Sequence, residues 1–184
     1  MIRPDSTAET AILAENSHPL VRLALAAIRE YVLYDRILSF SIPVTEEIPE
    51  KAGVFVSLKK DGGLRGCIGT ITATMRNVAE EVIHNAIRAA SEDFRFPPVE
   101  IQELNHLTCT VDILSPLEPV RDLKEMNPTQ YGVLVQQGIR KGLLLPDLPD
   151  VTSVDQQIVI AKEKAAIPAD EPCELFRFRV KRYR

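Results

Sequence analysis

A glycine-marked turn between two strand-like segments is the feature that most restricts how this chain can fold. Residues 53–60 alternate apolar and polar side chains, and residues 64–71 form a second strand-like segment directly after Asp61-Gly62-Gly63. Two such segments joined by a short glycine turn predict an antiparallel β-hairpin. An isolated hairpin is only marginally stable in water, so this one requires more strands or a helix against its apolar face.

Other segments of the chain supply such elements. Alternating or apolar patterns predict further strands at residues 107–114, 131–136, 142–145 and 175–183. Helices with apolar stripes are expected after three capping residues, Ser17, Thr74 and Ser153. Strands and helices do not follow each other as regular βαβ units, and hairpins dominate. We therefore predict an α+β fold of two lobes, each an antiparallel sheet flanked by helices, with a cleft between them.

The boundary between the lobes is expected where prolines interrupt the pattern. Ser115-Pro116 and Glu118-Pro119 break the chain directly after the strand at residues 107–114. The last strand is expected to return to the first sheet. This layout predicts a larger lobe of residues 1–115 plus 174–184, which contains both termini, and a smaller inserted lobe of residues 116–173.

Composition excludes several classes of partner. The 184 residues carry a net charge of −4, which gives no overall attraction to nucleic acid or to anionic lipid. Five basic residues lie between Arg177 and Arg184, and the solvent face of a strand is favoured over nucleic-acid contact there. No apolar run approaches the ~20 residues of a membrane span. The first 16 residues lack the layout of a signal peptide, so we expect a cytoplasmic protein.

Cysteines and histidines do not form a recognisable ligand set. The three cysteines are odd in number and widely spaced, and the three histidines are scattered. This pattern argues against a disulfide framework and against a metal site. No glycine-rich phosphate loop is found either, so we expect no cofactor.

The second strand of the predicted hairpin has an unusual composition. It reads Leu64-Arg65-Gly66-Cys67-Ile68-Gly69, and glycine weakens strand interiors. In a regular strand Arg65 and Cys67 share a face about 7 Å apart, and Gly69 on the same face leaves space beside the thiol. A guanidinium near a thiol favours the thiolate, and exposed backbone N–H groups could bind an oxyanion.

A plainer interpretation of these residues stays open. A single cysteine in a strand is usually a small buried hydrophobic residue, and the glycines could mark a β-bulge. Asp93 and Arg95 are two further candidates, because they could orient a ligand or Cys67. They could equally form an ordinary ion pair.

Several motifs together resemble one known family. The stretch from Leu64 to Gly69 resembles the six-residue signature of the AMMECR domain family, whose prokaryotic members are called AmmeMemoRadiSam system protein A. Residues 93–98 (Asp-Phe-Arg-Phe-Pro-Pro) resemble a second family stretch, in which proline stands at the position of Phe94. Residues 114–116, 131–133 and 142–146 resemble later motifs, so the likeness covers roughly residues 20–180.

The resemblance implies a fold, a site and partners. It implies two lobes with the signature at the cleft between them, which would place Leu64, Gly66, Ile68 and Gly69 around Arg65 and Cys67, with Asp93 and Arg95 nearby. It also implies association with Memo-like proteins and with radical SAM enzymes. No reaction follows from it.

Two hypotheses for function therefore stay open. In the first, the chain is an enzyme or enzyme component, with Cys67 as a reactive thiol stabilised by Arg65, acting on a protein or small molecule. In the second, it is an adaptor whose cleft holds a peptide or a partner protein, and Cys67 only lines the cleft.

Overall fold

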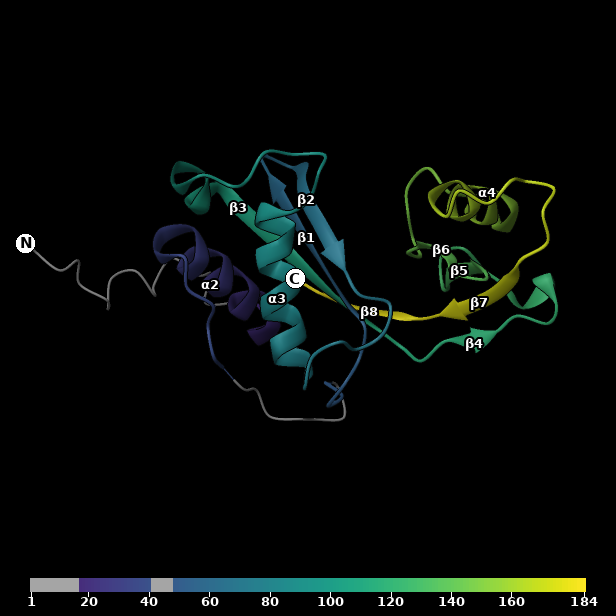
Figure 1. The fold of residues 1–184 in the computed structure, drawn as a ribbon, viewed down its shortest axis with the longest axis horizontal. Helices are drawn as coiled ribbons and strands as arrows, with labels where there is room; N and C mark the ends of the chain where they lie inside the picture. The colour runs from purple at the N-terminus through teal and green to yellow at the C-terminus, as the bar shows by residue number, and fades with distance from the viewer. Residues whose placement is uncertain (1–16, 41–47) are drawn as a thin grey trace, which may run out of the picture. The chain divides into compact units, whose positions relative to one another are not determined.

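Two antiparallel four-stranded sheets, each accompanied by helices, make up the structure, a computed structural model (Figure 1). It describes residues 17–40 and 48–184, so predictions that fall on residues 1–16 and 41–47 lie outside the described residues. The chain forms two compact units. The first runs up to Ile113 and includes Arg182–Arg184, and the second comprises Leu114–Lys181. The predicted α+β class is confirmed.

The sheet of the first unit has the strand order β2-β1-β3-β8. These strands are β1 (Val54–Lys60), β2 (Gly63–Gly69), β3 (Leu107–Leu114) and β8 (Val180–Tyr183). Helices α2 (Pro19–Tyr34) and α3 (Val78–Ser91) pack on each other, and α3 also packs on β1 and β2. Val54, Val56 and Leu58 are fully buried in this core, so the alternating Ser57 lies on the opposite face of β1.

Both helices of the first unit begin later than the sequence suggested. The cap of α2 is His18, whose Nδ1 accepts from the N–H of Leu20, rather than Ser17. The cap of α3 is Asn77 rather than Thr74. Thr74 instead donates its N–H and its hydroxyl to the buried carboxylate of Glu81, at 2.7 and 2.8 Å. This carboxylate therefore holds the preceding segment as a loop and delays the start of the helix.

The hairpin of β1 and β2 contains a β-bulge. Lys59 pairs with Leu64, but the preceding Leu58 pairs with Gly66, so Arg65 has no partner across the ladder. Gly66 is buried under α3, where an added Cβ would overlap the carbonyl oxygen of Ala89. Gly66 thus lies next to a β-bulge, and its lack of a side chain lets a helix approach the strand closely.

The second unit has a sheet in the order β4-β7-β5-β6. Its strands are β4 (Glu118–Pro119), β5 (Gly132–Gln137), β6 (Arg140–Leu144) and β7 (Glu174–Phe178). Helix α4 (Val154–Lys164) packs on β5 and β6, and begins with the predicted capping box of Ser153 and Gln156. A short 3₁₀ turn, η3 (Leu123–Glu125), follows β4.

The predicted last strand, residues 175–183, is in fact two strands in different sheets. Residues of β7 pair with β4 and β5, and only β8 joins the first sheet. The return to the first sheet therefore comes later than the predicted boundary at residue 174. Alternation of apolar and polar residues predicts that a segment is a strand, but the strand with which it pairs depends on which sheet edge is open.

Among the described residues, no helix is long and apolar enough to cross a membrane.

Candidate functional site

Cys67 lies in β2 and is half-buried. Its sulfur is 3.1 Å from the hydroxyl oxygen of Ser57, the residue directly opposite on β1. Because Ser57 faces away from the core, the thiol also lies on the face of the sheet opposite α3. Burial raises the pKa of the thiol, and the Ser57 hydrogen bond and the charge of Arg95 offset this only in part. Burial thus favours the protonated thiol over the thiolate.

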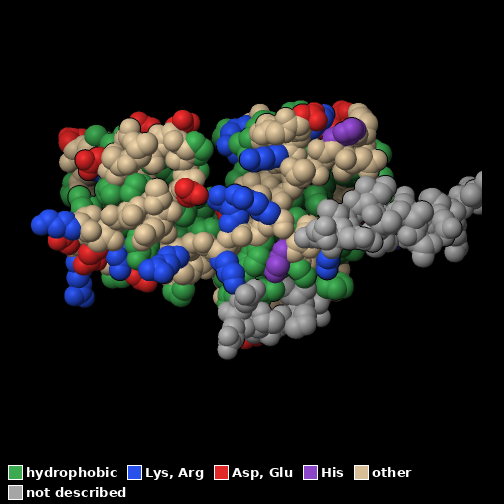
Figure 2. All heavy atoms as spheres, turned by 180° about the vertical axis from the view of Figure 1, so that it is seen from behind, with side chains coloured by type: hydrophobic (Ala, Val, Ile, Leu, Met, Phe, Trp, Pro, Cys, Tyr) green, Lys and Arg blue, Asp and Glu red, His purple; other side chains and the backbone are tan. Residues whose placement is uncertain are grey.

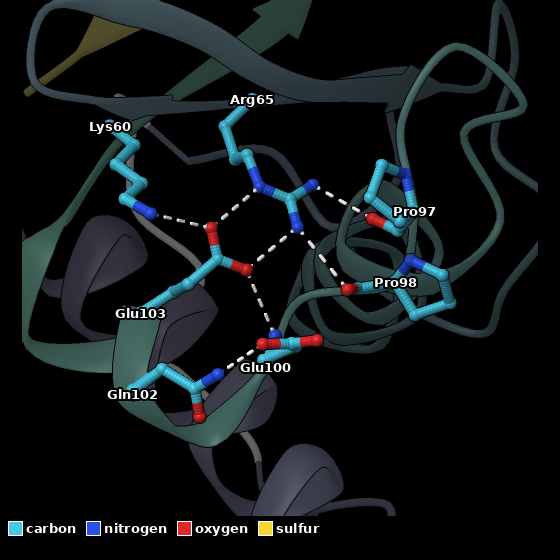
Figure 3. Close-up of polar contacts among 7 residues, drawn as sticks. All are labelled: Lys60, Arg65, Pro97, Pro98, Glu100, Gln102 and Glu103. Atoms are coloured by element: carbon cyan, nitrogen blue, oxygen red, sulfur yellow. Dashed lines mark hydrogen bonds and ion pairs between the residues drawn. The ribbon is translucent and has the colours of Figure 1, made fainter.

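Arg65 is held by a different group of residues, which Figure 3 shows. Its guanidinium binds both carboxylate oxygens of Glu103, at 3.0 and 2.8 Å, and donates to the carbonyls of Pro97 and Pro98. Glu103, in η2 (Ile101–His106), also accepts from Lys60 at 3.0 Å. This pairing raises the pKa of Arg65 and lowers that of Glu103 well below its usual range.

The expected shared face of Arg65 and Cys67 is therefore not found. The bulge removes Arg65 from the regular alternation of side chains along β2. The Glu103 carboxylate that binds Arg65 also binds Lys60, and Lys60 lies on the same face of β1 as its buried residues, which is the helix side of the sheet. The expected space beside Gly69 is also filled, because an added Cβ there would overlap the ring of Phe55. Arg95, not Arg65, is the guanidinium whose charge acts on the thiol.

Asp93 and Arg95 lie against the outer edge of β2, where they meet Cys67. The buried Asp93 carboxylate accepts the backbone N–H of Cys67 at 2.8 Å. Arg95 binds both oxygens of that carboxylate, at 2.9 and 2.6 Å, and its Nη2 also donates to the Cys67 carbonyl at 3.4 Å. The Asp93 carboxylate thus accepts from the Cys67 N–H, and Arg95 donates to the Cys67 carbonyl. These two side chains replace the hydrogen bonds that a neighbouring strand would make, and they cover this part of the sheet edge.

The other predicted residues differ in their exposure. Leu64 is 46% exposed, whereas Ile68 packs against the core of the first unit. Phe94, between Asp93 and Arg95, is 96% exposed. Of the predicted site residues, the structure therefore brings Cys67, Asp93 and Arg95 together, with an outward aromatic side chain beside them. The inter-lobe cleft stays a prediction.

Sequence reasoning missed two residues with clear roles. Glu103 forms a capping box with Glu100 at the start of η2, and this i, i+3 spacing is a signal that could have marked it. Ser57 is a polar residue on the outer face of a strand, which is an ordinary pattern and gave no signal. Among the described residues, no group of three or more His, Cys, Asp or Glu could hold a metal ion.

The Asp93 interactions predict an acid-sensitive contribution to stability. Hydrogen bonds from Arg95 and Cys67 lower the pKa of Asp93 from 3.8 to about 2. Because the folded pKa lies below the unfolded one, this contribution is present above pH 4 and is lost as pH falls through 2. A difference of this size corresponds to about 2 kcal/mol. We expect Asp93→Asn to lower the free energy of unfolding by about this amount at pH 7, measured by urea denaturation.

The pH dependence separates this effect from general acid sensitivity. The difference between wild type and Asp93→Asn should shrink below pH 4, since other titrating groups are common to both chains. Asp150→Asn, at an exposed turn of the second unit, is the control and should leave the free energy of unfolding unchanged. A difference that stays constant down to pH 2 would contradict the assigned role of the carboxylate.

Comparison with known proteins identifies the family. The AMMECR1 family model matches residues 21–183. A protein from Thermotoga maritima is 50% identical over 170 residues, covering 91% of this chain and 98% of the relative. A protein from Clostridium acetobutylicum is 43% identical over 173 residues, and this chain spans only 36% of its length. The crystal structure of the uncharacterized protein PH0010 from Pyrococcus horikoshii matches with a TM-score of 0.80 and 32% identity, covering 89% of this chain and 88% of that one. This chain therefore belongs to the AMMECR1 family.

Proposed function

We propose that this chain is a protein-binding module that presents the loop of residues 93–98, beside Cys67, to partner enzymes. The observation that carries the proposal is the 96% exposure of Phe94 on an anchored loop. Asp93 before it is buried and bonded to β2, and Arg95 after it is bonded to Asp93 through backbone and side chain. An aromatic side chain on a loop that is already ordered loses little further entropy on binding.

The surroundings of Phe94 favour a protein partner. Arg95 is 45% exposed in its side chain, and its Nη1 has no hydrogen-bond partner among the described residues. Pro97 and Pro98 are exposed as well, with carbonyls fixed by Arg65. Aromatic and arginine side chains are enriched at protein interfaces. A partner surface with an apolar pocket beside a carboxylate would complement this loop.

Memo-like and radical SAM proteins are the partners that the family resemblance suggests. The Clostridium acetobutylicum relative supports joint action, because most of its length lies outside the region matched by this chain. In that relative the matched region is thus joined covalently to additional sequence. In this proposal Arg65 stabilises the loop through Pro97 and Pro98, while Cys67 supplies the backbone groups that Asp93 and Arg95 bind.

The enzyme hypothesis requires a reactive thiol at Cys67. A nucleophilic cysteine needs a lowered pKa, whereas burial raises the pKa of this thiol. Arg65, the residue expected to activate it, is bound to Glu103 instead. The binding function is therefore the one that these residues support best.

The proposal predicts that Phe94 carries much of the binding energy. We expect Phe94→Ala to weaken binding to a purified Memo-like protein from the same genome by about tenfold or more, measured by isothermal titration calorimetry. Ile139→Ala is the matched control, since Ile139 is 98% exposed in the turn between β5 and β6. This control should bind as wild type does.

Two results would contradict the binding function. Equal affinity of wild type and Phe94→Ala would show that the loop is not the binding surface. A wild-type chain that binds no such partner, and whose Cys67 reacts with iodoacetamide faster than glutathione does at neutral pH, would favour the thiol enzyme instead.

A further inference from the structure

Strand β2 forms an outer edge of the first sheet. Among the described residues, the strand order β2-β1-β3-β8 leaves one side of β2 without a neighbouring strand. On its other side, the N–H of Thr70 donates to the Val54 carbonyl at 2.9 Å, and Ile68 pairs with β1 as well. Because backbone groups alternate in direction along a strand, those of Cys67 and Gly69 point away from β1, toward the open side.

This edge lacks the features that usually prevent two edge strands from pairing. Natural edge strands commonly carry lysine, other charged side chains or proline for this purpose. Residues 66–69 are Gly-Cys-Ile-Gly, with no charged side chain and no proline. Figure 2 shows charged side chains of both signs spread over the described surface, but these four residues contribute none. Protection of this edge must therefore come from outside the strand.

Asp93 and Arg95 supply this protection. The Asp93 carboxylate accepts from the Cys67 N–H at 2.8 Å, and Arg95 donates to the Cys67 carbonyl at 3.4 Å. The Asp93 side chain is only 3% exposed, and Arg95 binds both of its oxygens. The two side chains therefore hold a fixed position where the backbone of an added strand would lie, and they occupy both hydrogen-bonding groups of Cys67.

We propose that the Asp93–Arg95 pair closes the β2 edge to strand addition, and that the edge, once opened, pairs with the same edge of a second copy of this chain. Two β2 edges in antiparallel order present identical groups to each other. Cys67 of one copy would then exchange N–H···O=C bonds with Gly69 of the other. Residues 66–69 carry no charge, so repulsion between like charges does not oppose this pairing. The inference concerns self-association and does not require the partner enzyme proposed above.

Sedimentation velocity of the full chain over a range of concentrations tests the proposal. Asp93→Ala removes the acceptor of the Cys67 N–H and releases Arg95. We expect this variant to form dimers as concentration rises, whereas wild type stays monomeric. At low concentration the Cys67 amide of the variant should exchange with deuterium about tenfold faster or more than in wild type, because its hydrogen bond is lost. At high concentration the amides of Cys67 and Gly69 should become protected together.

Two further variants complete the experiment. Arg95→Ala frees only the Cys67 carbonyl, so its dimer should be weaker than that of Asp93→Ala, and it tests the proposal even if Asp93→Ala does not fold. Val111→Ala is the matched control for a general loss of stability. Val111 is fully buried in β3, which β1 separates from β2. This control weakens the core while the Asp93–Arg95 pair stays in place, so it should remain monomeric.

Four results would overturn the proposal. The first is that both Asp93→Ala and Arg95→Ala stay monomeric, and the second is that they associate without protection of the Cys67 and Gly69 amides. The third is that Val111→Ala associates to the same extent as Asp93→Ala. The fourth is that wild type itself forms dimers in which these two amides are protected.

Discussion

Replacing Gly66 with alanine is expected to lower the free energy of unfolding by about 3 kcal/mol. The added methyl would overlap the carbonyl oxygen of Ala89 in α3, and a helix backbone cannot move aside without losing its own contacts. The effect is measured by urea denaturation of the purified variant. The change is large because the obstacle is main chain rather than a flexible side chain.

Gly63→Ala is the matched control for this substitution. Gly63 lies in the same strand, and a Cβ there would be 3.5 Å from the Lys60 carbonyl oxygen, an ordinary contact. Its φ angle is not in the left-handed region, so alanine is tolerated without strain. Equal stability of the two variants would show that α3 does not require the glycine. It would then leave open a role for Gly66 in ligand binding.

Removal of the Arg65 guanidinium is the second change for which we expect a large loss of stability. We expect Arg65→Gln to lower the free energy of unfolding by about 3 kcal/mol, because it removes one partner of a largely buried ion pair. Both side chains of the Arg65–Glu103 pair are only 11% exposed. The carbonyls of Pro97 and Pro98 would also lose their donor. Urea denaturation at neutral pH measures the loss.

Lys60→Gln provides the comparison, since Lys60 binds the same Glu103 carboxylate. Its side chain is 37% exposed, so we expect a loss of about 1 kcal/mol or less. If both variants lost the same free energy of unfolding, any cation beside Glu103 would stabilise the fold equally. The bidentate geometry of Arg65 would then make no separate contribution.

The same variants separate a structural role of Arg65 from activation of the thiol. Arg65→Gln should leave the alkylation rate of Cys67 unchanged, because the guanidinium that acts on this thiol belongs to Arg95. Arg95→Gln should slow alkylation, since it removes an effect that lowers the pKa. If alkylation of Cys67 were slower in Arg65→Gln but not in Arg95→Gln, Arg65 would be the residue that activates the thiol, as the sequence suggested.

Local pattern in the sequence was sufficient for most elements and for the fold class. The strand at Leu107–Leu114 and the capping box of Ser153 were predicted because alternation and caps involve residues close in the chain. The position of Cys109 in the core follows from the same alternation; burial leaves it 7% exposed and raises its pKa to about 12. Family motifs also drew attention to Asp93 and Arg95, which do meet Cys67.

Only the tertiary structure decided which groups these residues contact. A bulge turned Arg65 out of the expected alternation, and Glu103, 38 residues away in sequence, holds its guanidinium. The pairing of Tyr131 with Arg179, 48 residues apart, likewise has no local signal. Periodicity specifies which side of an element is apolar because it reflects burial of neighbouring residues. The partner of a polar side chain depends instead on segments that packing brings together from distant parts of the chain.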